Sequence, residues 1–175
     1  MSEPTPSKRL VGTAVLDNPF VGELLGMRLI GVLATLEPDG SVHAVPMWLA
    51  PGDGAILLAA GSRSRKVRNL QRDPRATLVL HDSRPGAEVC GASIRGRVEL
   101  VSGDAATALV HEVHRRYVGD ARDRLPEVEA FLGSDDVAFR FVPETAFTWD
   151  ERGSDAAAVL RESAAAFPLE PTSPR

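Results

Sequence analysis

The chain has 175 residues, of which 43% are hydrophobic, so it is long enough to bury one substantial core and a single domain is expected. Its net charge of −4 argues against a general nucleic-acid-binding protein, and its one cysteine, Cys90, excludes an internal disulfide framework. No apolar run approaches the roughly 20 residues that span a bilayer, and residues 1–9 lack the apolar segment of a signal peptide. We therefore predict a cytoplasmic protein without a nucleic-acid or membrane partner.

The two ends of the chain are predicted to lie outside the folded domain. Residues 1–16 are expected to form a flexible N-terminal tail. Residues 153–175 combine an Ala-rich helical signal with several prolines and are expected to form a weakly ordered C-terminal tail. The domain between them, residues 17–152, is expected to begin with a short helix that has Asn18 as its N-cap and Pro19 at its first position.

Apolar and alternating runs predict the strands of this domain. The first three strands are joined by tight turns at residues 37–40 and 51–54, which indicates a meander. A doubly wound sheet would need helices at these places, so we predict a mainly β protein, an antiparallel barrel with peripheral helices. The predicted strands cover residues 29–36, 41–50, 55–60, 75–82, 89–101 and 137–149, the last one bent or broken at Pro143, and later helices are expected over residues 104–118 and 125–132.

The segment from Gly61 to Pro74 has the most distinctive charge pattern of the chain. Residues 61–72 contain five positive charges and no negative one, although the whole chain has a net charge of −4. The pattern predicts a short helix between two strands, whose first N–H groups Ser62 and Ser64 are able to cap. A helix N-terminus carries free N–H groups and a positive dipole end, which suit a phosphate or a carboxylate. The alternative is a solvated charged surface whose serines cap the helix without any ligand.

Other polar residues give weaker signals, and the chain contains no nucleophile-elbow, Walker or Gly-x-Gly-x-x-Gly motif. His111 and His114 are three residues apart rather than the four of a zinc-protease helix, so a metal site is not expected there. Cys90 alternates with core residues in its strand and is expected to be inert packing. His43 and His81 lie on predicted strands and face either a pocket or solvent.

The segment Val45-Pro46-Met47-Trp48 lies inside a predicted strand. Because a proline removes one donor from the hydrogen-bond ladder, this strand is expected at a sheet edge or at a local opening. An open backbone beside Met47 and Trp48 would make a floor for a planar ring. The alternative is an edge strand with a tryptophan packed into the core.

Taken in order, these motifs resemble the pyridoxamine 5′-phosphate oxidase-like split-barrel flavoproteins, most closely those that use the deazaflavin coenzyme F420. The resemblance runs from about Met27 to Leu100. It rests on the hairpin at residues 31–40, on residues 45–48 and, most specifically, on the Ser-x-Lys-x-x-Asn-Leu-x-x-Asp-Pro motif at residues 64–74. It implies a six-stranded antiparallel split β-barrel, which agrees with the strand count from the pattern alone, and a homodimer with two cofactor sites at its interface.

The resemblance assigns cofactor-binding roles to two groups of residues, because a flavin needs an anion cradle at one end and an apolar slot at the other. The phosphate is assigned to Ser62, Ser64, Lys66 and Asn69, with Arg63 or Arg65 assisting. The ring is assigned to Val45, Pro46, Met47, Trp48, Ala59 and Ala60. Relatives often carry an aromatic residue where Ala87 and Glu88 stand, so the substrate contacts are not assigned. Residues 94–98 resemble the FMN-using oxidases, which keeps FMN as the alternative to F420.

The predicted function is therefore that of an oxidoreductase that transfers hydride between a bound cofactor and a small organic substrate. No side chain needs to act as a covalent nucleophile, and a proton would come from water or from His43. Two alternatives remain: an FMN-binding member of the same family, and a carrier or sensor that binds a flavin or haem without turnover. A haem protein would need an axial ligand, and His43 is the one candidate in the predicted pocket.

Overall fold

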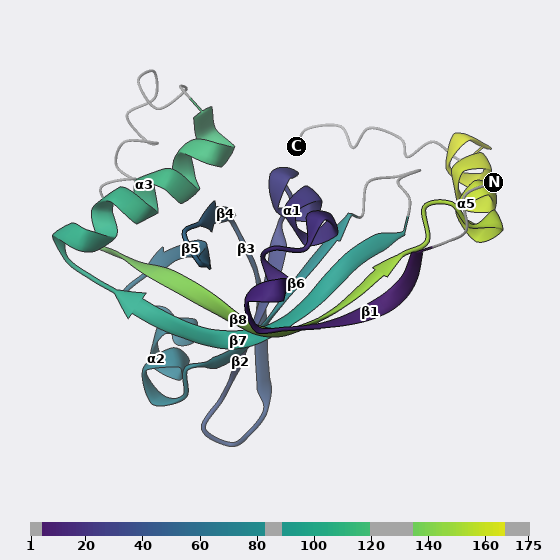
Figure 1. The fold of residues 1–175 in the computed structure, drawn as a ribbon. Coiled ribbons are helices and arrows are strands. Elements are labelled where there is room, and N and C mark those ends of the chain that lie inside the picture. The colour runs from purple at the N-terminus through teal and green to yellow at the C-terminus, as the bar shows by residue number, and fades with distance from the viewer. Residues whose placement is uncertain (1–4, 83–88, 120–134, 167–175) are drawn as a thin grey trace.

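The computed structural model describes residues 5–82, 89–119 and 135–166, which form one curled antiparallel sheet with helices around it (Figure 1). The hydrogen-bonded order of the strands is β3-β2-β6-β7-β8-β5-β4, and β1 also pairs with β8. The strands are β1 (Thr5–Val11), β2 (Gly31–Leu36), β3 (Val42–Met47), β4 (Leu49–Gly52), β5 (Ala55–Gly61), β6 (Arg75–Asp82), β7 (Cys90–Val101) and β8 (Asp136–Asp150). The helices are η1 (Gly12–Val15), α1 (Pro19–Gly26), α2 (Arg65–Arg72), α3 (Asp104–Val118) and α5 (Asp155–Ala166).

Strand β8 connects the two halves of the sheet. One edge of β8 pairs with β7 along almost its whole length. The other edge pairs with β5 over residues 136–141 and with β1 over residues 145–150. Strands β5 and β1 therefore pair with successive parts of the same edge of β8, and the sheet splits between these two strands. This arrangement confirms the predicted mainly β split-barrel class.

A bulge in β8 helps to curl the sheet. The register with β7 shifts between Arg95 and Gly96, so that Glu144 has no opposite residue in β7. Such an extra residue bends its strand and increases the local twist. A Cβ atom at Gly96 would lie 2.2 Å from the carbonyl oxygen of Val142, so only glycine allows the two backbones to approach this closely.

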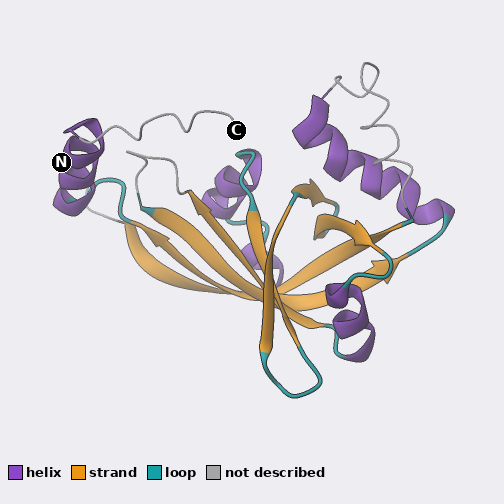
Figure 2. Cartoon of the chain, turned by 180° about the vertical axis from the view of Figure 1, so that it is seen from behind, coloured by secondary structure: helices purple, strands orange, loops and turns teal. Residues whose placement is uncertain are grey.

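The core fills the hollow of the curled sheet, where α1 lies (Figure 2). Asn18 caps α1 through its side-chain oxygen and Pro19 is its first residue, as predicted. Cys90 is buried in this core, which confirms its predicted packing role. The largest fully buried members of the core are Leu24, Leu33, Leu49, Ile56, Leu58, Leu78, Leu80, Ile94, Phe139 and Phe141. A smaller cluster joins β4 and β5 to α3.

Several predicted elements differ in extent from those observed. The predicted strand 41–50 is two strands, β3 and β4, interrupted at Trp48. The last predicted strand is continuous through Pro143, because the bulge at Glu144 accommodates it. The predicted helix 125–132 lies outside the described residues.

The prediction of a loose N-terminal tail is wrong for residues 5–16. Residues 5–11 form β1, which pairs with β8, and Val15 is fully buried. An edge strand of this kind depends on its partner in the sheet, which its own sequence does not reveal. At the other end, α5 agrees with the predicted helical signal of the C-terminal segment, but a 12-residue helix there differs from the weakly ordered tail predicted for residues 153–175. No helix in the described ranges is both long enough and apolar enough to cross a membrane.

The outer face of the sheet carries a row of mostly apolar side chains. Register pairs connect Pro46 to Val32, Val32 to Val79, Val79 to Ser93 and Ser93 to Phe147, across five neighbouring strands. Val32 is 40% exposed and Phe147 is 51% exposed. Residues that are paired in this way project from the same face of the sheet. The row is therefore an apolar strip on the surface, interrupted by Ser93 between Val79 and Phe147.

Candidate functional site

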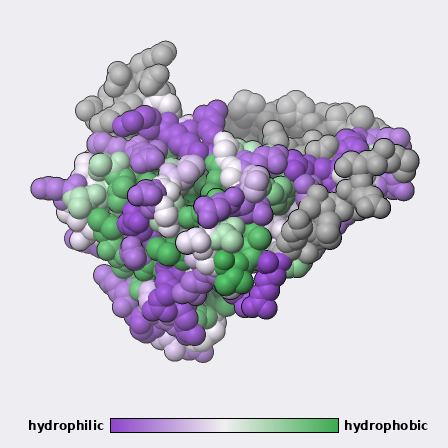
Figure 3. Space-filling model, in the orientation of Figure 1, coloured by the Kyte–Doolittle hydropathy of each residue, from purple (hydrophilic) through white to green (hydrophobic). Residues whose placement is uncertain are grey.

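Helix α2 is held on the sheet by its inner face. It follows β5 after a turn at residues 61–64, and Val67 and Leu70, three residues apart, are buried against the core. Its other face carries Arg65 and Arg68, which are exposed. Figure 3 shows hydrophilic residues gathered at the lower left of the view, where α2 lies in Figure 1. The predicted basic helix is therefore present, with its N-terminal end at the end of β5.

Asn69 anchors α2 to two strands. Its Nδ2 donates to Thr35 Oγ1 at 3.2 Å, and Thr35 Oγ1 donates to the carbonyl oxygen of His43 at 3.3 Å. Arg72 donates to Asn69 Oδ1 and to the carbonyl oxygen of Leu36. Asn69 is only 2% exposed, so its amide group bonds to residues inside the protein. The structure thus gives Asn69 a positioning role that its assignment as a phosphate ligand did not include.

The two serines at the start of α2 do not cap it. Ser64 occupies the N-cap position, but no side chain of the described chain caps the first turn. Ser62 Oγ donates instead to Asp135 Oδ2 at 2.5 Å. The prediction of two serine caps is therefore wrong, because the Ser62 hydroxyl donates to Asp135 and the Ser64 hydroxyl makes no hydrogen bond to a helix N–H group.

The hydroxyl of Ser64 is a buried polar atom, and it makes no hydrogen bond within the described residues. Buried polar atoms in proteins are nearly always paired, since leaving one unpaired costs about 1–3 kcal/mol. Beside it, the helix start offers free N–H groups with a positive dipole end. These features together fit an anion at this position better than a purely solvated helix end.

The cations around this helix end differ in their partners. Arg65 Nε lies 3.7 Å from Glu37 Oε1, and both Arg63 and Arg68 are exposed, with no ion pair to any residue the structure describes. Lys66 is partly buried. Burial lowers the pKa of the Lys66 ammonium, and the nearby Asp136 carboxylate opposes that effect. Three cations therefore remain available to a bound anion: Arg63, Lys66 and Arg68.

The residues predicted to contact a ring are divided between the core and the surface. Strand β3 is at one edge of the sheet, as predicted from Pro46, which is exposed. Met47 and Ala60 are buried in the main core, and Val45 packs against it. Of these predicted residues on β3 and β5, Pro46 is the exposed one, and it lies beside the free backbone edge of β3, where a ring would have access.

Trp48 is packed against α3 rather than exposed as a floor. Its ring stacks on Tyr117, with centroids 5.0 Å apart and planes at 4°, and it meets the edge of His114 at 5.9 Å. Ala59 belongs to the same cluster. Tyr117 Oη donates to the carbonyl oxygen of Leu29 at 2.6 Å and accepts from the backbone N–H of Leu49 at 3.2 Å. This contact fixes the break between β3 and β4 and agrees with the alternative of a packed tryptophan.

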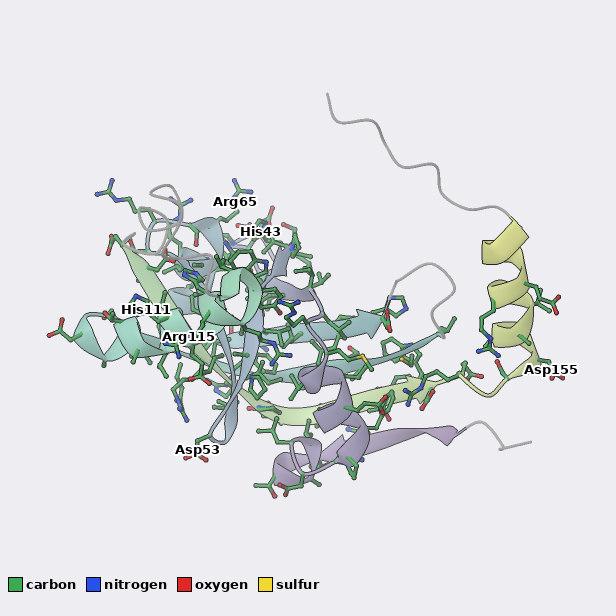
Figure 4. All side chains as sticks on the ribbon, turned by 90° about the horizontal axis from the view of Figure 1, so that it is seen from above. His43, Asp53, Arg65, His111, Arg115 and Asp155 are labelled. Atoms are coloured by element: carbon green, nitrogen blue, oxygen red, sulfur yellow. The ribbon has the colours of Figure 1, made fainter. Side chains whose placement is uncertain are left out.

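His43 is the one predicted proton donor, and it is half-buried on the edge strand β3. Figure 4 shows His43 and Arg65 at the same end of the molecule, with Asp155 at the far end. His43 pairs in register with Thr35, whose hydroxyl accepts from Asn69 of α2, so the side chain of His43 projects from the face of the sheet that α2 covers. Among the described residues, no group of His, Cys, Asp and Glu side chains is placed to hold a metal ion, so the His111–His114 pair is not part of such a site.

Sequence reasoning missed two carboxylates beside α2. Asp136 pairs in register with Gly61, the last residue of β5, and Asp135 precedes it. His114 Nε2 lies 3.7 Å from Asp136 Oδ2. Nothing local in the sequence indicates this neighbourhood, because it depends on the pairing of β8 with β5, which are about 75 residues apart in the chain.

Two cavities of the described chain lie away from α2. One, of about 260 Å³, opens on the outer face of β2, β6 and β7 and includes Arg75, Arg95 and Glu144. The other, of about 630 Å³, lies between η1, α1, the β4–β5 turn and β8. No α2 residue lines either of them. Neither of these two cavities is therefore part of the α2 site.

Comparison with known families decides what kind of protein carries this site. Residues 19–150 match the family described as pyridoxamine 5′-phosphate oxidase. The chain belongs to this family. No curated protein matches the chain.

Solved structures agree with this membership. A conserved hypothetical protein, Rv2991 from Mycobacterium tuberculosis, is 28% identical over 90% of this chain and 92% of its own, with a TM-score of 0.66. An F420 reductase is 28% identical over 71% of this chain and 93% of its own, with a TM-score of 0.57. HutZ, the heme storage protein from Vibrio cholerae, is 16% identical over 76% of this chain and 94% of its own, with a TM-score of 0.57, and shares the fold alone.

The pyridoxamine 5′-phosphate oxidase match includes every element that builds the α2 site. It extends from α1 to the end of β8, and β1 and α5 lie outside it. The predicted resemblance, made on residues 27–100, is thus confirmed over a longer stretch of the chain. The residues of the α2 site therefore lie inside the region that matches the family.

Proposed function

We propose that this chain binds a flavin-type cofactor at the N-terminal end of α2 and along β3. We further propose that it works as an oxidoreductase on a small organic substrate, with coenzyme F420 favoured over FMN. The observation that carries the proposal is the buried hydroxyl of Ser64, which lacks a hydrogen-bond partner in the described chain beside an uncapped helix start and Lys66. A phosphate oxygen would satisfy this hydroxyl and the free N–H groups together.

The residues of α2 fit a cofactor phosphate. The ammonium of Lys66 is partly buried, so its attraction to an anion is screened less than that of a fully exposed lysine. Arg63, in the turn before α2, and Arg68, on the outer face of the helix, extend this positive charge. Ser62 would contribute only if its hydroxyl were to leave Asp135.

The redox chemistry would belong to the cofactor, which supplies hydride transfer when it is bound. The chain would hold the phosphate at α2 and orient the ring along the open edge of β3 beside Pro46. Asn69 would keep the two parts in fixed relation, because its bonds link α2 to β2 and, through Thr35, to β3. His43 or water would hold the proton, since no nucleophilic side chain is needed.

Coenzyme F420 is favoured for two reasons. The basic residues of α2 suit the longer polyanionic tail that F420 carries beyond its first phosphate. The F420 reductase that is 28% identical also covers 71% of this chain. FMN is the alternative cofactor, and a binding protein without turnover is the alternative function.

The test is the cofactor itself. We expect protein purified from a host that makes both cofactors to show the absorption of the deazaflavin, and equilibrium titration to give a lower Kd for F420 than for FMN. Tighter binding of FMN would move the protein to the FMN-using group. Failure of the chain to bind either cofactor at micromolar concentrations would overturn the proposal. Binding without turnover of any acceptor would identify a carrier.

A further inference from the structure

Two carboxylates lie beside the proposed anion site. Asp135 accepts hydrogen bonds from both the backbone N–H of Ser62, at 2.9 Å to its carbonyl oxygen, and the Ser62 hydroxyl, at 2.5 Å to Oδ2. Asp136 pairs in register with Gly61 and lies close enough to Lys66 to affect its pKa. Both carboxylates are therefore fixed against the turn that leads into α2. They would repel the anion that the helix end attracts.

The charges around this turn nearly cancel. The cations are Arg63, Arg65, Lys66 and Arg68, and the carboxylates are Glu37, Asp135 and Asp136. His114, the other neighbour of Asp136, adds no charge near pH 7.5, because its burial lowers its pKa despite the opposing effect of Asp136. Four cations against three carboxylates leave about one positive charge for a ligand.

We infer that this site is matched to a singly charged phosphodiester and disfavours a doubly charged phosphomonoester, with Asp135 and Asp136 as the specificity-determining residues. The inference rests on the proposed function. A phosphomonoester carries nearly two charges at pH 7.5, because its second pKa is near 6. Asp135 and Asp136 therefore repel a doubly charged phosphomonoester more strongly than a singly charged phosphodiester. The first phosphate of F420 is a diester and that of FMN is a monoester, so the site would select between them by charge at the phosphate itself.

The experiment compares ligands that differ only in this charge. The first pair is FMN and its methyl phosphodiester, and the second pair is the 5′-phosphate of the F420 deazaflavin core and its methyl phosphodiester. Kd values are measured by quenching of ring fluorescence at pH 7.5 and constant ionic strength. We expect the wild-type protein to bind each diester more tightly than its monoester. We expect Asp135→Asn and Asp136→Asn each to shift this ratio toward the monoester by roughly threefold to tenfold.

The control and the second arm keep the test decisive. Asp53→Asn removes a carboxylate on the opposite side of this end of the molecule from Arg65 (Figure 4) and should leave the ratio unchanged. Because Asp136 also neighbours the buried His114, Asp135→Asn is the arm that leaves the core untouched. A ratio that neither variant changes overturns the inference while the proposed function stands. If the wild-type protein binds none of the four ligands, the proposed site falls and the inference falls with it.

Discussion

Lys66 is the cation that the proposed site depends on most, because it is partly buried at the start of α2. We expect Lys66→Ala to weaken cofactor binding by about 1.5–3 kcal/mol, the scale of a lost charge-assisted hydrogen bond, which is roughly 10-fold to 150-fold in Kd. The melting temperature should change little, since such a substitution on a helix surface is nearly neutral. Titration with F420 and FMN at two ionic strengths measures the effect.

Arg72→Ala is the matched control for Lys66→Ala. Arg72 lies at the far end of α2, where it donates to Asn69 and to the carbonyl oxygen of Leu36. We expect Arg72→Ala to lower the melting temperature and to leave the affinity for the cofactor nearly unchanged. Lys66→Ala should show the reverse pattern. Equal and small losses of affinity in both variants would mean that α2 is only a charged surface.

His114 gives the stability of the protein a pH dependence. It is 3% exposed, and burial lowers its pKa, with His111 acting in the same direction and Asp136 against it. A histidine with a lowered pKa binds fewer protons folded than unfolded, so its contribution is complete above the unfolded pKa of about 6.5 and declines as pH falls below it. We expect the melting temperature to drop between pH 7.5 and 5.5 more steeply in the wild type than in His114→Gln. Parallel curves would show that folding does not lower the pKa of His114.

At the scale of elements, the attachment of α2 depends on one buried amide. Asn69→Ala would remove the hydrogen bond that the buried Thr35 hydroxyl accepts, and the bond from Arg72. We expect a loss of about 1–3 kcal/mol in the free energy of unfolding, measured by urea denaturation. Gln71→Ala, on the exposed side of the same helix, should be within about 0.5 kcal/mol of the wild type. A silent Asn69→Ala would mean that α2 is held by Val67 and Leu70 alone.

The sequence allowed prediction of the elements that carry local signals. The cap at Asn18, the strong alternation of β7 and the 15-residue helix α3 were all predictable, because each signal lies within its own segment. Strand β1 was not, since an edge strand of this kind depends on its pairing with β8. The break at Trp48 was missed for a similar reason, because Tyr117 on a distant helix stabilises it.

The residues of the candidate site also separate into those with a local sequence signal and those that only long-range packing brings together. Lys66 and Ser64 follow from a motif read along one helix, whereas Asn69 has an interior role that only the packing of α2 on β2 defines. Asp135 and Asp136 come to α2 through the pairing of β8 with β5. Pattern reasoning therefore predicted the proposed anion site but not the two carboxylates beside it.

At the scale of the whole molecule, a single chain gives no reason for the exposed apolar side chains on the outer face of the sheet. The strip leaves the apolar side chains of Val32 and Phe147 exposed, with Val79 and Ser93 between them, although the opposite face of the same strands already packs into the core. Contiguous exposed apolar patches on soluble proteins mark interaction surfaces. Pro46 of the proposed ring site stands at one end of the strip. We therefore propose that a second copy covers this face and completes the cofactor site.

This proposal predicts a homodimer that depends on the strip. Phe147→Lys would place a charge where two copies meet, and because Phe147 is exposed in one chain, the fold of that chain should be little disturbed. We expect the wild type to sediment as a dimer at micromolar concentration, and the variant to sediment as a monomer with weaker cofactor binding. Val159→Lys, which changes an exposed valine on α5 away from the strip, should remain dimeric. A wild-type monomer with cofactor bound would contradict the dimer, and a dimeric Phe147→Lys would place its interface elsewhere.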